Sequence, residues 1–307
     1  MKFWVLRIKV MKTIIKNITL IVFLFGAQNT YCQNVGADTV YYRSGFSSRV
    51  FINVNQNDAL ALTKILTENV VRESSLSVKS TTPHFFENFD DIDKSILEEK
   101  DDLYILLSTE YLSLKNNHLL EPIVVANRNI SVYDVYQLIV KKESNNKSLG
   151  DLKGKKIIIG ESREGDIAHH WLDNLLSKSN LEVKEKFFGE IKILEKSLPA
   201  LLPVFFGTAD ACIVTENLVR TAYEMNPQLE SELTSIDKSK PLLIAILANR
   251  KTLPVELKKE LTNGLLELDK TTDGKQILTL FRINGLKPFK IEYLKNVSEL
   301  IKMENSK

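Results

Sequence analysis

Apolar residues along this chain fall into short continuous runs, separated by segments with helical spacing. The runs at 103–108 (LYILLS), 156–160 (KIIIG) and 211–214 (ACIV) are too short for buried helices and predict strands covered on both faces. Residues 58–71 and 167–178 carry apolar side chains every three or four positions, which predicts helices. This alternation of strands and helices predicts an α/β fold.

The same reasoning applies to the rest of the chain. Further strand-like runs lie at 40–46 (VYYRSGF), 49–54 (RVFINV), 122–127 (PIVVAN), 135–142 (VYQLIVKK) and 241–251 (PLLIAILANRK). A helix is expected over 198–206. Pro199 suits its first turn, whereas Pro203 should shorten or kink it.

Three of the predicted strands are followed by a short polar loop and then by a helix. These loops are STEY (108–111), ESREGD (161–166) and TEN (215–217). In open α/β sheets, ligands bind beyond the carboxyl ends of the strands, where the N–H groups of helix N-termini converge. The three loops therefore mark the predicted position of a binding site.

A polar segment at 143–156 (ESNNKSLGDLKGKK) separates two groups of strands and indicates two lobes. We expect a discontinuous first lobe, made of 38–132 and 242–300. The second lobe, 133–241, is then inserted between two hinge strands. A cleft between such lobes is a common place for a small ligand.

The N-terminus has the pattern of a secretory signal peptide. Lys12 and Lys16 precede an apolar stretch, ITLIVFLFGA at 18–27, which is too short to span a bilayer. We expect a signal peptide over 1–32 and a periplasmic or secreted protein. A lipid anchor on Cys32 is the alternative, although the bulky Tyr31 before it argues against that reading.

Charge excludes some classes of partner. The first 32 residues hold five basic and no acidic residues, so the remaining chain carries 41 − 5 = 36 basic against 39 acidic residues, a formal charge of −3. Such a chain has no electrostatic attraction to nucleic acid.

Cys212 lies inside an apolar run and is expected to be a buried thiol. His169 and His170 point about 100° apart on a helix, so we expect structural roles rather than a metal site.

Several motifs, in this order, resemble one family of binding proteins. The motifs are DLYILLSTEYL (102–112), SLGDLKGKKIIIG (148–160), GTADACIVTEN (207–217) and a helical tail at 253–289. They resemble periplasmic solute-binding proteins of the phosphate, phosphite and phosphonate type, which serve ABC importers, and the resemblance covers about 40–300. It implies a two-lobed fold of the type 2 periplasmic-binding-protein class, which closes on its ligand around a hinge.

The resemblance also implies ligand-binding positions in the loops at the tips of the lobes. Carried over by position, the set is Thr109, Tyr111, Ser162, Arg163, Glu164, Lys196, Ser197, Thr215 and Glu216. Phosphonate binders carry Ser-Thr-Ser-Gly where this chain has Ser162, Arg163, Glu164 and Gly165. A carboxylate repels a phosphonate unless that carboxylate is paired with an arginine or with an ammonium group on the ligand. A zwitterion, with its acid group on Arg163 and Lys196 and its ammonium on Glu164 or Glu216, therefore fits slightly better than bare phosphate.

The hypothesis is an exported solute-binding protein that captures a small anionic or zwitterionic ligand, such as a phosphonate or phosphite, for an ABC permease. We expect a monomer with no cofactor, metal or catalytic residue. A ligand-sensing module that reports to a membrane partner remains an alternative. A cofactor-biosynthesis enzyme on the same fold is a further one, although none of the four histidines follows a nucleophile motif such as GxSxG.

Overall fold

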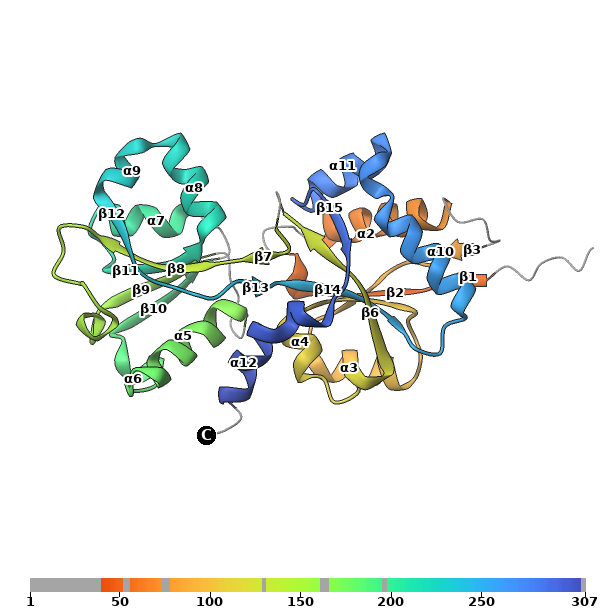
Figure 1. Ribbon diagram of the computed structural model, residues 1–307, viewed down its shortest axis with the longest axis horizontal. Helices are drawn as coiled ribbons and strands as arrows, with labels where there is room; N and C mark the ends of the chain where they lie inside the picture. The colour runs from red at the N-terminus through yellow and green to blue at the C-terminus, as the bar shows by residue number, and fades with distance from the viewer. Residues whose placement is uncertain are drawn as a thin grey trace, which may run out of the picture. The chain divides into compact units, whose positions relative to one another are not determined.

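Two β-sheets organise the chain. The computed structural model describes residues 40–51, 56–72, 78–128, 131–160, 166–194 and 198–304 (Figure 1). The first sheet has the strand order β15 (Gly285–Pro288), β6 (Leu120–Asn127), β14 (Ala245–Arg250), β5 (Leu103–Leu107), β2 (Ser44–Ser47) and β4 (His84–Phe86). The second has the order β10 (Glu190–Leu194), β9 (Lys156–Gly160), β11 (Ala211–Thr215), β8 (Tyr136–Lys141) and β12 (Leu233–Lys238).

Alternate side chains of the first sheet enter two different cores. Leu103 and Ile105 of β5 pack with apolar residues of α2 (Gln56–Arg72), α10 (Val255–Leu266) and α11 (Thr272–Leu280). Tyr104 and Leu106 of the same strand face the other way, into the cluster that contains α3 (Phe89–Leu97). Successive side chains of a strand point to opposite faces, so the continuous apolar run LYILL reflects cover on both faces.

The second sheet follows the same rule. In β11, Cys212 and Val214 pack with α7 (Leu198–Phe205), α8 (Glu216–Met225) and α9 (Pro227–Glu232). Ala211 and Ile213 face α5 (Ile167–Lys178) and α6 (Lys184–Phe187). Strands β10, β9 and β11 are parallel, whereas β8 and β12 are antiparallel to their neighbours. The predicted strands KIIIG and ACIV and the helix over 167–178 are confirmed.

Two short strand pairs complete the described structure. β1 (Val40–Tyr42) pairs with β3 (Val78–Ser80), and β13 (Leu242–Leu243) pairs antiparallel with β7 (Tyr133–Asp134). The second pair lies where the chain passes between the two large sheets, so β7 and β13 are the hinge strands (Figure 1). The predicted run at 241–251 is thus divided into a hinge strand and a sheet strand.

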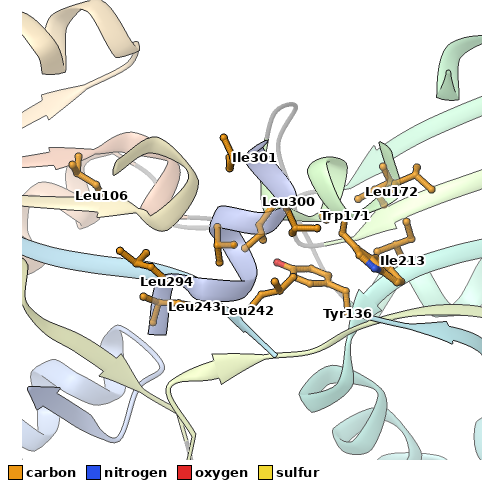
Figure 2. Packing of buried hydrophobic residues seen from close by; sticks show 14 of the residues in the cluster. Leu106, Tyr136, Trp171, Leu172, Ile213, Leu242, Leu243, Leu294, Leu300 and Ile301 are labelled. Atoms are coloured by element: carbon orange, nitrogen blue, oxygen red, sulfur yellow. The ribbon is translucent and has the colours of Figure 1, made fainter. Parts of the chain in front are cut away.

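The C-terminal helix α12 (Lys295–Glu304) belongs to an apolar cluster that continues through both lobes. Its Leu300 and Ile301 are buried together with Trp171 of α5 and Leu242 of β13. Figure 2 shows this helix between residues of the first sheet, such as Leu106, and residues of the second, such as Ile213. The two lobes therefore share part of one hydrophobic core.

Some predicted elements are wrong in detail. The described part of RVFINV is a 3-10 turn, η1 (Ser48–Val50), because the Ser47 hydroxyl accepts a hydrogen bond from the Arg49 N–H (3.3 Å) and ends the strand. STEY is not a loop but the start of α4 (Ser108–Ser113). TEN is likewise the last residue of β11 followed by the first turn of α8. Helix α2 extends the predicted 58–71 by a residue or two at each end.

Among the described residues, no helix combines the length and the apolar character needed to cross a membrane.

Candidate functional site

A small cavity with a mixed polar and apolar lining lies at the carboxyl ends of strands from both sheets. Its volume is about 90 Å³. It is lined by Arg49, Val50, Phe51, Leu62, Leu107, Arg128, Asp134, Tyr136, Thr215, Ile244, Leu280, Phe281 and Arg282. Strands β2 and β5 of the first lobe and β11 of the second lobe end at it, and the hinge residues Asp134 and Ile244 complete it. We call it the cleft cavity.

A second cavity is larger, at about 550 Å³, but it lies at the other end of the first sheet. His84 begins β4 and Asp101 precedes β5, so this cavity is at the amino ends of the strands. Helix N-termini that follow the strands do not reach that end. We therefore assign the binding site to the smaller cleft cavity.

One arginine of the cleft cavity, Arg128, pairs with a carboxylate at the hinge, that of Asp134. Arg128 Nη1 donates a hydrogen bond to Asp134 Oδ2 (3.0 Å), and Asn217 Nδ2 donates to Asp134 Oδ1 (3.0 Å). Asp134 is buried, because only 3% of its surface is exposed. Arg128 follows β6 in the first lobe and Asn217 lies in the first turn of α8 in the second, so this carboxylate joins the two lobes at the hinge.

Arg49 makes a second contact between the lobes. It belongs to η1 of the first lobe, and its Nη1 lies 3.9 Å from Oδ1 of Asp166, the N-cap residue of α5. The same guanidinium lies over the ring of Phe89, 5.7 Å from the ring centroid. An aromatic face attracts a cation, so Phe89 helps to hold Arg49 at the cavity.

Of the predicted site residues that the structure describes, Thr215 lines the cleft cavity. It ends β11 and caps α8, with its hydroxyl accepting a hydrogen bond from the Leu218 N–H (3.4 Å). Its neighbour Glu216 does not line the cavity. The Glu216 carboxylate instead accepts hydrogen bonds from Gln137 (2.9 Å) and Lys238 (3.0 Å) of the second sheet.

Thr109 and Tyr111 are not among the residues that line the cleft cavity. Thr109 is buried in the first turns of α4, and Tyr111 is partly buried against the cluster shared by the lobes. Burial raises the pKa of the Tyr111 hydroxyl above its ordinary value.

Glu110 is a buried acid in the same turn. Its Oε1 accepts a hydrogen bond from the Ser47 hydroxyl (2.7 Å), and its Oε2 accepts one from the Leu107 N–H (2.8 Å). Burial raises the pKa of Glu110, against the opposing effect of these two hydrogen bonds. The carboxylate joins the ends of β2 and β5, and this explains why α4 starts directly after the strand.

His169 lies in the first turn of α5 and is buried, with 3% of its surface exposed. Neither ring nitrogen has a hydrogen-bond partner among the described residues. Burial, with a smaller contribution from the nearby positive charges of Lys184, His170 and Arg49, lowers the pKa of His169 to about 4. The ring is therefore neutral at pH 7. The described part of the chain contains no cluster of three or more His, Cys, Asp or Glu side chains suited to a metal ion.

The remaining predicted site residues lie outside the described residues. They are Ser162, Arg163, Glu164, Lys196 and Ser197. Sequence reasoning also missed the three arginines of the cleft cavity. Arg128 carried a usable signal, because it directly follows the predicted strand PIVVAN, whereas Arg49 was placed at the start of a predicted strand, RVFINV.

The geometry and the comparisons together define the class of protein. Two α/β lobes joined by hinge strands, with a cavity at the strand ends, form a type 2 periplasmic-binding-protein fold with an interlobe cleft. The model of the ABC transporter phosphonate periplasmic substrate-binding protein family matches residues 55–294, and the chain belongs to this family. It is a family of solute-binding components of importers, not of enzymes, and it acts outside the cytoplasm with a membrane permease.

Solved structures with the same fold are distant in sequence. A binding protein of an ABC phosphonate transporter from Pseudomonas aeruginosa is 16% identical, with a TM-score of 0.59 and 87% of each chain covered. PhnD1 from Prochlorococcus marinus, in complex with methylphosphonate, is 18% identical with a TM-score of 0.59, covering 87% of this chain and 99% of its own. A Xanthomonas citri protein bound to ATP is 12% identical with a TM-score of 0.63, covering 85% and 95%. A comparison with curated proteins gave no match.

Proposed function

We propose that this protein captures a small anionic or zwitterionic solute in the cleft cavity and presents it to an ABC permease. The observation that carries the proposal is the cleft cavity itself, where strand ends of both lobes meet three guanidinium groups and one carboxylate. Closure of two lobes on a ligand removes the ligand from water and strengthens each charged contact. The binding energy then stabilises the closed arrangement that the permease receives.

The proposal includes the lobe boundaries. The first lobe comprises 38–132 and 242–300, and the second comprises 133–241. The sheets support these limits, because the strands of the six-stranded sheet lie at 44–127 and 245–288 and those of the five-stranded sheet lie at 136–238. A signal peptide at 1–32, a monomeric state and the absence of nucleic-acid binding belong to the same proposal.

The predicted loop residues remain part of the proposed site. Ser162, Arg163 and Glu164 follow β9, and Lys196 and Ser197 follow β10, so both groups come after strands of the second sheet. Thr215 ends the neighbouring strand β11 and lines the cavity. We propose that the two loops contact the ligand from the second lobe, opposite Arg49.

A thermal-shift screen tests the proposal. The panel contains phosphate, phosphite, alkylphosphonates, sulfonates and amino acids, each added to the full chain. A ligand present at 100 times its Kd should stabilise the folded state by about 2.7 kcal/mol through mass action. One chemical class should raise Tm while the others leave it unchanged. If no member of the panel raises Tm and turnover of a small molecule is detected instead, the proposal is wrong.

A further inference from the structure

A groove runs along the outer edge of the first sheet. Four consecutive residues, Pro83 to Phe86, line the cavity of about 550 Å³, and they include the whole of β4. Successive side chains of a strand point to opposite faces of the sheet, so a cavity that contacts all four residues extends beside the strand and not over one face. We call this cavity the edge groove. It shares no lining residue with the cleft cavity.

Two helices form the walls of the edge groove. Figure 1 shows α2 and α3 on opposite faces of the first sheet. Asn57 and Leu60 of α2 line the groove on one side, and Lys94 and Ser95 of α3 line it on the other. The floor of the groove is therefore the edge of the sheet, with one helix on each side.

The backbone of β4 has an unpaired edge. It is the last strand of its sheet, and the described strand that pairs with it is β2. Outside that pairing, no described residue forms a backbone hydrogen bond with residues 83–86. An edge strand presents N–H and C=O groups that a further strand can bond. We propose that the edge groove binds an extended peptide segment of a partner protein, which adds to β4 as a further strand.

The dimensions of the groove suit a short single strand. Four residues of extended chain span about 13 Å, at about 3.3 Å per residue. Pro83 has no N–H group, so the added pairing begins at His84. A second copy of this chain is a poorer occupant, because its own β4 lies between the same two helices and those helices would meet α2 and α3. The occupant is therefore a segment of roughly four or five residues.

The α3 wall offers positive charge to this segment. Lys94 is exposed and forms no hydrogen bond or ion pair with a described residue. His84 Nδ1 lies 2.8 Å from Oδ1 of the fully buried Asp101, which fixes the ring and leaves Nε2 as the nitrogen that can meet a ligand. The Ser95 hydroxyl donates to Oδ2 of the same carboxylate (2.7 Å) and holds it in place.

The acids of the lining oppose this charge only weakly. Asp101 is covered by His84, with no exposed surface. Asp91 accepts a hydrogen bond from Asn88 (2.8 Å) and lies in the first turn of α3, where the positive end of the helix dipole stabilises a carboxylate. Lys94 lies one turn further along the helix and has no such partner. An acidic side chain of the added strand therefore pairs with Lys94.

The α2 wall is apolar and partly open. Leu60 and Phe85 line the groove and are only partly buried. Phe85 packs against the rings of Phe46 (5.9 Å between centroids) and Phe51 (5.6 Å), so it is held in place. An apolar side chain of the added strand would remove this surface from water. Since side chains of a strand alternate, the segment carries apolar residues on one side and acidic residues on the other.

Labelled peptides test the inference on the full chain. The probe is Val-Glu-Val-Glu-Val, and the controls are Val-Lys-Val-Lys-Val and the acidic peptide with N-methylated backbone amides. Fluorescence polarisation should show that the acidic probe binds at least tenfold more tightly than either control. Equal binding of the lysine peptide overturns the charge assignment, and equal binding of the methylated peptide overturns strand addition. Failure of the acidic probe to bind at millimolar concentration overturns the whole inference.

Two further measurements place the peptide in the edge groove. Added hydrogen bonds at β4 should slow amide hydrogen exchange of residues 84–86 when the acidic probe is bound. Lys94→Gln should weaken binding by about threefold, as expected for the loss of an exposed ion pair. Lys64→Gln is the matched control, because Lys64 lies on α2, pairs with Glu68 and does not line the groove. Unchanged exchange of 84–86, or unchanged affinity in Lys94→Gln, overturns the inference and leaves the proposed function standing.

Discussion

The rings of Tyr136 and Trp171 pack against each other, with centroids 6.3 Å apart and planes inclined by 31°. Tyr136 lines the cleft cavity, and Trp171 is buried in α5 beside the C-terminal helix (Figure 2). A change at the cleft can therefore reach Trp171 through one aromatic contact.

Trp171 should report ligand binding by its fluorescence. The chain has two tryptophans, Trp4 and Trp171, so a Trp4→Phe variant leaves Trp171 as the single emitter. We expect its emission to change in intensity or wavelength when a ligand closes the cleft. Trp171→Phe should abolish the signal without abolishing the heat of binding. A ligand that binds by calorimetry but leaves the emission unchanged would show that the cleft and α5 are not coupled.

Glu110 should make stability depend on pH at mildly acidic values. Its folded-state pKa is raised by burial, so its contribution to stability is present below the unfolded pKa and is lost as pH rises through the folded pKa. Glu110→Gln removes this titration and keeps both hydrogen bonds, since an amide can accept from Leu107 and donate to Ser47. We expect this variant to equal or exceed the wild type at pH 7 in urea denaturation.

Glu110→Ala is the contrasting variant. It leaves the Leu107 N–H without its acceptor at a buried strand end, which should cost about 1–3 kcal/mol of the free energy of unfolding. If the Gln and Ala variants are destabilised equally, the hydrogen bonds to Glu110 do not hold the strand ends together.

His169 should produce the opposite pH dependence. Its folded pKa is about 4 against an ordinary 6.5, so the unfolded chain binds the proton more readily. Stability is then full above pH 6.5 and is lost as pH falls towards 4, by up to about 2 kcal/mol at pH 5. His169→Leu should shrink the difference in unfolding free energy between pH 7 and pH 5. His118→Gln, at an exposed position, should leave it unchanged. An unchanged difference in His169→Leu would contradict the prediction.

Gly160 should be intolerant of a side chain. It ends β9, and a Cβ at this position would lie 2.6 Å from the Ala200 Cβ and 3.1 Å from Val214 Cγ1. Gly160→Ala should lower the free energy of unfolding by about 1–3 kcal/mol through overpacking. Gly150→Ala is the matched control, since its nearest neighbour would be the Ser148 hydroxyl at 3.7 Å. Equal stability of the two variants would mean that α7 adjusts at no cost.

Much of the fold could be predicted because apolar runs report burial directly. KIIIG and ACIV are strands covered on both faces, and the helical spacing of 167–178 reflects a helix packed on one side. The helix that starts at Ser108 was harder to predict, since it depends on a tertiary contact. Glu110 receives a hydrogen bond from Ser47, 63 residues earlier in the chain, and no local pattern shows this.

The site could be predicted only in part for a related reason. Thr215 was found because it ends a recognisable strand. Arg49 and Arg128 line the same cavity only because strand order brings β2, β5, β14 and β6 together, and Arg282 arrives from a helix near the C-terminus. Strand order is a property of the whole sheet, so residues that are distant in sequence meet without any motif that joins them.

The C-terminal helix also limits how this protein can be re-engineered. Helix α12 belongs in sequence to the first lobe, yet its Leu300 and Ile301 are buried in a cluster with Trp171 of the second. Asn296 donates a hydrogen bond to the Pro241 carbonyl at the hinge (2.8 Å), and Lys240 pairs with Glu299 (2.7 Å). A chimera that grafts the second lobe of a relative onto this chain must therefore bring that relative's own terminal helix, or the graft will meet a surface shaped for a different neighbour.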